Sequence, residues 1–231
     1  MRKDIAIATI TSDKCGNIDV IKQGLETLNK KFDVYVADRN SSEEFLEDIR
    51  NMGCKRIIGP NKTLPDQHKQ VLLCASENKP YVLYTEPDKV DWFNNGLEKS
   101  IEEFFLRELD HGEVSRTPEQ MKTFPVPQQM TEGVVNNLLG QITGIQGDYI
   151  YGPQISSSEI LKTLKSLPKD ISYLGWGTLT YIPIKAKEKG LRIGMIYNAN
   201  ECPISQRNED NADYRVQQAN GNIAGILLGL K

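Results

Sequence analysis

The chain has 231 residues, of which 39% are apolar and 26% are charged, and its formal net charge is −3. This length suits one large domain, or at most two small ones. No Lys/Arg block suggests a nucleic-acid surface, and no apolar run approaches the length of a membrane span.

The cysteines and the first residues indicate where the protein works. Its four cysteines are far apart and form no CxxC pair, which favours free thiols in a reducing compartment. The opening residues "MRKDIAIATITSDK" have too short an apolar stretch for a signal peptide. We therefore expect a cytoplasmic protein.

The first ninety residues alternate between strand and helix patterns. Strands are predicted at 4–11, 32–42 (ending in a polar loop), 54–60 and 81–86. Helices are predicted at 18–28 and 65–77, and a further helix between them begins at a capping box formed by Ser41 and Glu44. Such alternation predicts an α/β fold with a mostly parallel, doubly wound sheet and helices on both faces.

The second half is less regular. Helices are predicted at 97–108, 134–142 and 156–167, together with a short helix that ends at Gly190 and a helix at the C-terminus. Strands are predicted at 147–153 and 191–197. Residues 112–130 are polar with three prolines, which predicts a long loop that acts as a lid. We expect a single domain over 1–231, with a nucleotide-binding half at 1–95 and an acceptor-side half at 96–231.

Two acidic residues follow the fourth predicted strand, in "YVLYTEPDK". Pro87 stiffens an extended link, so Glu86 and Asp88 should share one side, where their charges repel unless a cation lies between them. Hard oxygen ligands suit Mg²⁺ or Mn²⁺. A solvated acidic turn is the alternative.

Asp38 ends the second predicted strand, so it should lie on the same rim of the sheet, where ligands of such folds bind. It could accept hydrogen bonds from a nucleobase or ribose. The alternative is a turn or cap acid, a role for which Asp before Ser-Ser is suited.

Other candidate groups lie near the C-terminus. Glycines on both sides of Trp176 would expose an indole for stacking on a sugar ring, whereas the alternative is a core tryptophan beside a tight turn. Arg207 and Arg215, with Gln218, could bind phosphates, although a solvated polar helix explains the run at 205–222 equally well.

The sequence lacks the motifs of several other enzyme classes. His68 and His111 have no evident partner, so Ser-His-Asp catalysis has no support. No GxGxxG or Walker fingerprint occurs either, which weakens a dinucleotide or ATP reading.

With "VYVADRNSS" after the second strand pattern and "YVLYTEPDK" at the fourth, the chain resembles the GT-A fold glycosyltransferases of the family 2 type over roughly residues 4–200. In that family the second strand ends in an Asp that touches the nucleobase, and a D-x-D-like element binds ribose and a divalent metal. The resemblance implies a nucleotide site of Thr9, Asp38, Glu86 and Asp88, with Mn²⁺ or Mg²⁺ on the last two.

The chain departs from the family in two places. Its metal element is Glu-Pro-Asp, and "YLGWGTLT" replaces the Glu-Asp pair that supplies the catalytic base of inverting members. The candidate bases are therefore Glu132, Asp148 and Asp170, while Gln206, Arg207 and Arg215 are similar to the C-terminal Gln/Arg motif of processive members and Trp176 would border the sugar or acceptor.

The leading hypothesis is transfer of a sugar from a nucleotide-sugar donor to an unknown acceptor. A non-catalytic nucleotide- or sugar-binding protein on the same fold is an alternative, favoured by the missing base. A nucleotidyltransferase is a third, but "TSDKCGN" poorly matches the Gly-rich basic loop that it needs after the first strand. Self-association into a homo-oligomer is also considered.

Overall fold

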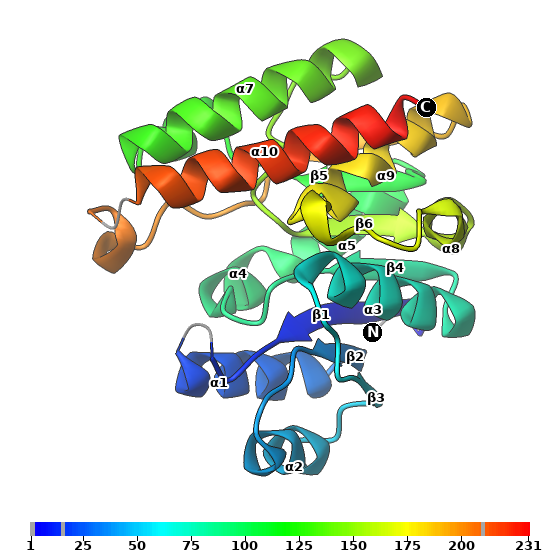
Figure 1. The fold of residues 1–231 in the computed structure, drawn as a ribbon, viewed down its shortest axis with the longest axis vertical. Helices are drawn as coiled ribbons and strands as arrows, with labels where there is room; N and C mark the ends of the chain where they lie inside the picture. The colour runs from blue at the N-terminus through cyan, green and yellow to red at the C-terminus, as the bar shows by residue number, and fades with distance from the viewer. Residues whose placement is uncertain (1–2, 15–16, 209–210) are drawn as a thin grey trace. The chain divides into compact units, whose positions relative to one another are not determined.

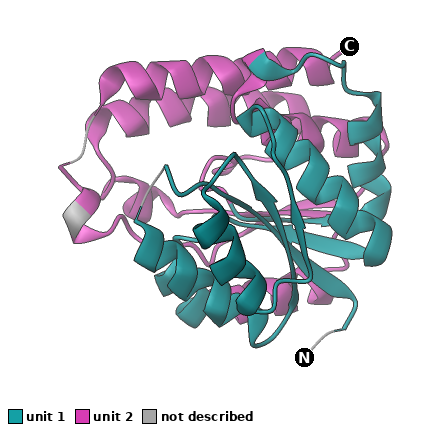
Figure 2. Ribbon diagram, turned by 60° about the horizontal axis from the view of Figure 1, so that its bottom comes forward, with its two compact units in different colours: residues 1–95, 153–172 teal, residues 96–152, 173–231 magenta. Residues whose placement is uncertain are grey.

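The chain forms two compact units, distinguished by colour in Figure 2. In the computed structural model, residues 3–14, 17–208 and 211–231 are described. Unit 1 comprises residues 1–95 and 153–172, and unit 2 comprises residues 96–152 and 173–231. The division expected at residue 95 coincides with one of these boundaries, whereas 153–172 returns to unit 1. That the whole chain is one domain stays a prediction.

Unit 1 contains strands in the order β3-β2-β1-β4-β6. The first four are parallel to their neighbours, and β6 pairs antiparallel with β4. The strands are β1 (Ile5–Thr11), β2 (Asp33–Asp38), β3 (Arg56–Ile58), β4 (Tyr81–Tyr84) and β6 (Gln154–Ser157). The near-continuous burial of β1 and β2 is typical of parallel strands that are covered on both faces.

The strand order reverses at β1, because β2 and β3 lie on one side of it and β4 lies on the other. Since crossovers between parallel strands are right-handed, the helices before and after this reversal cover opposite faces. The helices of unit 1 (Figure 1) are α1 (Ile18–Asn29), α2 (Glu43–Asn51), α3 (Leu64–Asn78), α4 (Val90–Asn95) and α8 (Ser158–Leu161), followed by a 3₁₀ turn η1 (Lys162–Ser166). The predicted doubly wound, mostly parallel sheet is confirmed.

Side-chain caps fix where the helices of unit 1 begin. Asn17 caps α1 and Thr63 caps α3, each by accepting hydrogen bonds from backbone N–H groups of the first turn. The expected capping box of Ser41 and Glu44 is wrong by one residue, since Ser42 is the N-cap of α2. The Ser41 hydroxyl instead donates to Asp38.

Unit 2 pairs β5 (His111–Val114) in parallel with β7 (Ile193–Ile196). Its helices are α5 (Leu97–Leu106), α6 (Pro118–Met121), α7 (Val126–Thr143), α9 (Gly177–Glu188) and α10 (Ala212–Gly229), with 3₁₀ turns η2 (Ser172–Leu174), which begins in unit 1, and η3 (Ile204–Gln206). A hydrophobic cluster joins α7, α9, α10 and β7, and is formed by Val135, Leu139, Tyr149, Ile184, Met195 and Ile226.

Two expectations for unit 2 are wrong. The loop at 112–130 is instead the end of β5, helix α6 and the start of α7, because Pro118 and Pro127 occupy first-turn positions where a helix accepts proline. The strand at 147–153 is absent because its backbone groups bond to side chains: Ser115 donates to the Asp148 carbonyl, and Asn136 accepts from Tyr149 N–H. A strand forms only after this segment, as β6 (Gln154–Ser157) of unit 1.

Two further expectations concern cysteines and membranes. Cys54, Cys74 and Cys202 form no disulfide, and Cys15 lies outside the described residues. Across the described ranges, the helices are too short or too polar for any of them to cross a bilayer.

Helices α9 and α10 approach each other at backbone distance, and glycines permit this. A Cβ on Gly177 would lie 2.1 Å from the Gly221 carbonyl oxygen, and one on Gly225 would lie 2.0 Å from the Gly177 carbonyl oxygen. Any larger residue would have to push one helix axis away from the other.

We predict that Gly225→Ala destabilises the protein by about 1–3 kcal/mol, the usual cost of overpacking. Gly133→Ala in α7 is the control, because no atom lies within 4 Å of its added Cβ. Alanine has the higher helix propensity, so this control should gain up to about 1 kcal/mol. Urea unfolding measures both, and equal stability of the two variants would contradict the packing account.

Candidate functional site

The carboxyl ends of β1, β2 and β4 define a polar rim on unit 1. These strands are parallel, so Thr11, Asp38 and Tyr84 end them at the same edge. The strand order reverses at β1, and ligands of open α/β sheets bind at such reversals. The residues that the sequence predicted to bind a nucleotide lie on these strands or directly after them.

Asp38 is buried and held on both carboxylate oxygens. Its Oδ1 accepts from the hydroxyls of Thr11 (3.2 Å) and Ser41 (2.6 Å), and its Oδ2 accepts from Ser41 N–H (2.9 Å). The side chain therefore organises the turn after β2. It also borders a pocket of about 590 Å³ that extends from Ser41 to Pro60.

Two amide side chains that no sequence pattern indicated form hydrogen bonds to the ends of β1 and β2. Gln67 of α3 donates to the carbonyls of Thr11 and Ala37, both at 2.9 Å, and so joins β1 to β2. Asn61 donates to the Asp38 carbonyl at 2.9 Å, while its own Oδ1 is buried without a hydrogen-bond partner in the described structure. Gly59 and Pro60 predicted that a strand ends before Asn61, but not that the Asn61 side chain bonds to the Asp38 carbonyl.

Thr9 lies two residues before Thr11 on β1, so both side chains point to the same face. It is fully buried, and its hydroxyl has no hydrogen-bond partner in the part of the chain that the structure describes.

Glu86 and Asp88 follow β4 directly. The Glu86 side chain is only 17% exposed, and its Oε2 lies 3.8 Å from Lys89 Nζ, too far for a hydrogen bond. That oxygen has no hydrogen-bond partner in the described chain. The pKa of Glu86 is raised, mainly by burial. The Lys89 charge lowers this pKa, and the nearby Asp88 charge raises it.

The position of this acidic element is fixed by α1. A Cβ on Gly24 would lie 1.8 Å from the Pro87 carbonyl oxygen, so only glycine lets the helix pack against it. Asp88 is exposed beside the half-buried Glu86. No group of three or more His, Cys, Asp or Glu gathers around an ion site in the described residues. One or two carboxylates are nevertheless what Mg²⁺ usually takes from a protein, and a buried oxygen without a partner fits a cation there.

Behind this element, His68 of α3 and Tyr84 form a buried pair. His68 Nε2 lies 2.9 Å from the Tyr84 hydroxyl, and the rings meet edge to face. Burial lowers the pKa of His68 to about 3. The pKa of Tyr84 is raised by burial, and further by Glu86 and Asp88. The expectation that the histidines lack partners is wrong, since His111 likewise lies 2.9 Å from Glu113 in β5.

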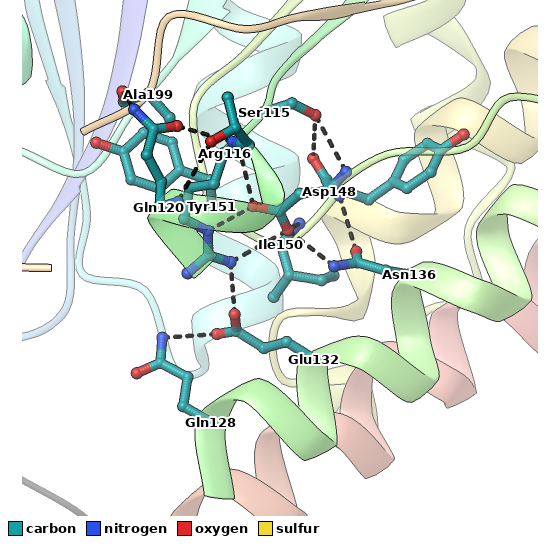
Figure 3. A network of polar contacts seen from close by, with 12 residues as sticks. Ser115, Arg116, Gln120, Gln128, Glu132, Asn136, Asp148, Ile150, Tyr151 and Ala199 are labelled. Carbon is teal, nitrogen blue, oxygen red and sulfur yellow. Dashed lines mark hydrogen bonds and ion pairs between the residues drawn. The ribbon is translucent and has the colours of Figure 1, made fainter. Parts of the chain in front are cut away.

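Figure 3 shows a second polar network, in unit 2, centred on Arg116. This guanidinium is 3% exposed and bonds Asp148 through Nε (2.5 Å) and Glu132 through a terminal nitrogen (2.5 Å). The rings of Phe124 and Tyr151 lie 4.3 and 5.6 Å from it. No sequence pattern marked Arg116, which lies in the short connection between β5 and the α6 N-cap Thr117.

The two candidate bases in this network already use all their oxygens. Asp148 Oδ1 accepts from Asn136 and from Ile150 N–H, besides Arg116, and Glu132 Oε1 accepts from Gln128. Burial works to raise the pKa of Asp148, but the Arg116 charge and these hydrogen bonds outweigh it and the pKa is lowered. Burial dominates for Glu132, whose pKa is raised.

The third candidate base, Asp170, belongs to unit 1 and is not part of this network. It is exposed and accepts hydrogen bonds from Ser172 N–H (3.1 Å) and the Ser172 hydroxyl (2.7 Å), which lower its pKa. This is the arrangement of a turn-forming aspartate.

The predicted sugar- and acceptor-binding residues are spread over the C-terminal part of unit 2. Trp176 is the half-buried N-cap of α9, and the glycine after it serves the contact with α10. Gln206 is exposed in η3. Arg207 pairs with Glu201 at 3.0 Å, and Arg215 donates to Gln218 at 3.1 Å.

No protein-family model matches the chain, and no curated protein sequence does so either. Solved structures of glucosyl-3-phosphoglycerate synthase from Mycobacterium tuberculosis do match. The complex of that enzyme with UDP has a TM-score of 0.69 at 13% identity, covering 98% of this chain and 80% of that chain. The complex with Mn²⁺, UDP and glucosyl-3-phosphoglycerate has a TM-score of 0.66 at 12% identity, covering 98% and 80%.

A third structure of that enzyme, with Mg²⁺ and UDP, has a TM-score of 0.65 at 11% identity, covering 98% of this chain and 79% of that chain. The enzyme is a nucleotide-diphospho-sugar glycosyltransferase with the GT-A fold. This chain therefore has the GT-A fold, as its strand motifs predicted. At such identities the likeness defines the fold and leaves the chemistry to the residues.

We predict that Arg116→Met costs about 3–5 kcal/mol, because it leaves two carboxylates buried without their cation. Arg50→Met is the matched control, since Arg50 forms an exposed pair with Glu43. Exposed pairs contribute roughly 0–1 kcal/mol. Urea unfolding at neutral pH measures both. An Arg116→Met variant as stable as the control would show that the network contributes nothing to folding.

His68 gives the stability a pH dependence. Its pKa is about 3 in the fold and about 6.5 in an unfolded chain. The unfolded state therefore binds more protons between these values, and stability present above pH 6.5 is lost as the pH falls towards 3.

We predict that the loss from His68 reaches about 2 kcal/mol at about pH 5, at 1.36 kcal/mol for each pH unit. The variant His68→Gln should lack this contribution, so its urea-unfolding free energy should fall less than that of the wild type between about pH 7 and 5. Parallel profiles would mean that His68 binds its proton equally well in both states.

Proposed function

We propose that this protein transfers a sugar from a nucleotide-sugar donor to an acceptor, and that it uses a divalent metal ion. The observation that carries the proposal is Glu86, a largely buried carboxylate with an oxygen that lacks a hydrogen-bond partner in the described chain, at the strand-order reversal of a GT-A fold. The solved enzyme of this fold described above was crystallised with UDP and with Mn²⁺ or Mg²⁺.

In this proposal Glu86 and Asp88 hold Mn²⁺ or Mg²⁺, completed by water and by the diphosphate of the donor. The ion would neutralise the charge of the diphosphate as it leaves. Thr9 and Asp38 are proposed to contact the nucleoside, as the family resemblance implies. Asp38 ends β2, and the buried Thr9 lies two residues before the end of β1. The fixed hydrogen bonds of Asp38 pre-organise that contact.

The acceptor side is proposed to include Trp176, Gln206, Arg207 and Arg215, as the family resemblance implies. Among the candidate catalytic carboxylates Glu132, Asp148 and Asp170, Glu132 has the raised pKa that a proton-transfer group needs near neutral pH. It would have to leave Arg116 or Gln128 to act on a substrate.

One observation favours a second function, binding without catalysis. Asp148 and Glu132 both have every carboxylate oxygen occupied by hydrogen-bond donors of the protein itself. A protein that binds a nucleotide or a sugar without turnover needs no free base. Release of nucleoside diphosphate from a nucleotide-sugar separates the two functions, because only the transferase produces it.

Thermal melting against nucleoside diphosphates and nucleotide-sugars, with and without Mn²⁺, tests the proposed site. A ligand at about 100 times its Kd adds about 2.7 kcal/mol, which for this chain length is a rise of about 5–10 °C in Tm. We predict such a rise with one nucleotide, larger with Mn²⁺ than without.

Glu86→Gln and Asp88→Asn should each lose the part of the rise that depends on Mn²⁺, while both variants keep their fold. Glu26→Gln on α1 is the control, because Glu26 is exposed and loses the same charge. If Glu86→Gln and Glu26→Gln respond to nucleotide and Mn²⁺ alike, the assignment of the metal site is wrong.

A further inference from the structure

Helices α7 and α10, side by side in Figure 1, expose an unusual number of large apolar side chains. Their buried sides meet in the hydrophobic cluster of unit 2, so these exposed side chains lie on the outer surface of the pair. We call this surface the α7–α10 face, and it is formed by Val126 (64% exposed), Met130 (68%), Val134 (54%), Leu138 (39%), Val216 (51%), Leu227 (58%) and Leu230 (56%).

The seven residues of the face are uncharged, although Asp213 and Arg215 in the first turn of α10 and Lys231 after Leu230 flank it. Although 26% of the chain is charged, residues 126–143 and 216–230 contain a single charged residue, Glu132. Glu132 is buried and paired with Arg116, so it does not reach the surface. A helix exposed to water normally carries charges on its outer side. An apolar, uncharged face of this extent is typical of an interaction surface.

We propose that the α7–α10 face binds the same face of a second copy of this chain. In a two-fold symmetric dimer the same patch of both copies meets across the axis. A charged residue on the patch would therefore lie near a residue of the same charge on the partner. A face without charges avoids that repulsion. Nucleic acids and anionic membranes are recognised by clusters of Lys and Arg instead, whereas α10 offers only Arg215 and the following Lys231 beside the face.

The sequence of α10 fits such self-pairing. Val216, Asn220, Leu227 and Leu230 are exposed, and with Ile223 they follow the four, three, four and three residue spacing of a coiled-coil seam. Ile223, at the middle of this seam, is half-buried against the hydrophobic cluster of unit 2. A single Asn in an apolar seam is the residue that fixes register and favours two strands. Amide side chains both donate and accept hydrogen bonds, so Asn220 can bond to its own copy.

The size of the face sets the expected affinity. An 18-residue helix is about 27 Å long, and two neighbours cover a width of about 20 Å, which gives a footprint of roughly 500 Å². Stable interfaces bury about 800 Å² on each partner, so this one lies at the small end. We expect a reversible dimer with a Kd on the order of micromolar, visible as a mass that rises with concentration.

Sedimentation equilibrium from about 1 to about 200 µM tests the proposal, since this range brackets a micromolar Kd. The wild-type mass should rise from 26.0 kDa towards twice that value. Met130→Lys and Leu227→Lys should each stay at 26.0 kDa, because the dimer would bury the new charge. Leu106→Lys is the control: Leu106 is 85% exposed at the end of α5, outside the face.

Circular dichroism and urea unfolding confirm that the variants are folded. A wild type that remains at 26.0 kDa at the highest concentration would overturn the proposal. So would a Met130→Lys or Leu227→Lys chain that dimerises as the control does. Flotation of the wild-type monomer with vesicles of phosphatidylcholine and phosphatidylserine would also overturn it and assign the face to lipid.

Discussion

Each buried carboxylate of this protein needs a cation or several hydrogen-bond donors in place of the water that it has lost. Arg116 supplies the cation for Asp148 and Glu132, and Thr11 and Ser41 supply donors to Asp38. These internal partners hold the turn after β2 to β1. They also tie the segment between β5 and α6 to α7 and to the segment between α7 and β6. Most of the polar interior follows from this requirement.

Glu86 is a half-buried carboxylate with an oxygen that no donor of the described chain satisfies. The Lys89 ammonium lies 3.8 Å from its Oε2, too far for a hydrogen bond. A folded protein tolerates such a group where function requires it. The parallel ends of β1, β2 and β4 place Glu86 on the edge of the sheet where α/β proteins bind ligands. A metal ion on the diphosphate of a ligand would complete its coordination.

The sequence predicted unit 1 better than unit 2, for a physical reason. In unit 1, buried strands alternate with capped amphipathic helices, so hydrophobic period and turn residues mark each element. In unit 2, Pro118 and Pro127 resembled loop signals, whereas they lie in the first turns of α6 and α7. Residues 147–153 have the composition of a strand, but side chains of Ser115 and Asn136 take up their backbone bonds. Contacts of this range leave no local pattern.

The same distinction applies to the site. The positions of Glu86, Asp88 and Asp38 at strand ends were predictable, because each strand and the residues after it form one chain segment. Their roles in a binding site stay predictions. Arg116, Gln67 and Asn61 were not, because each acts through partners distant in sequence. The GT-A fold also leaves the reaction open, since activity resides in the residues that a fold carries.

The most direct test of the central claim is electron paramagnetic resonance of Mn²⁺ in the presence of nucleoside diphosphate. Free Mn²⁺ gives a sharp six-line spectrum that weakens when the ion is bound. The account predicts that wild-type protein and nucleotide together remove more free Mn²⁺ than the nucleotide alone, by one ion per chain, and that Glu86→Gln abolishes this excess. The same free Mn²⁺ with and without the wild-type protein would contradict the account.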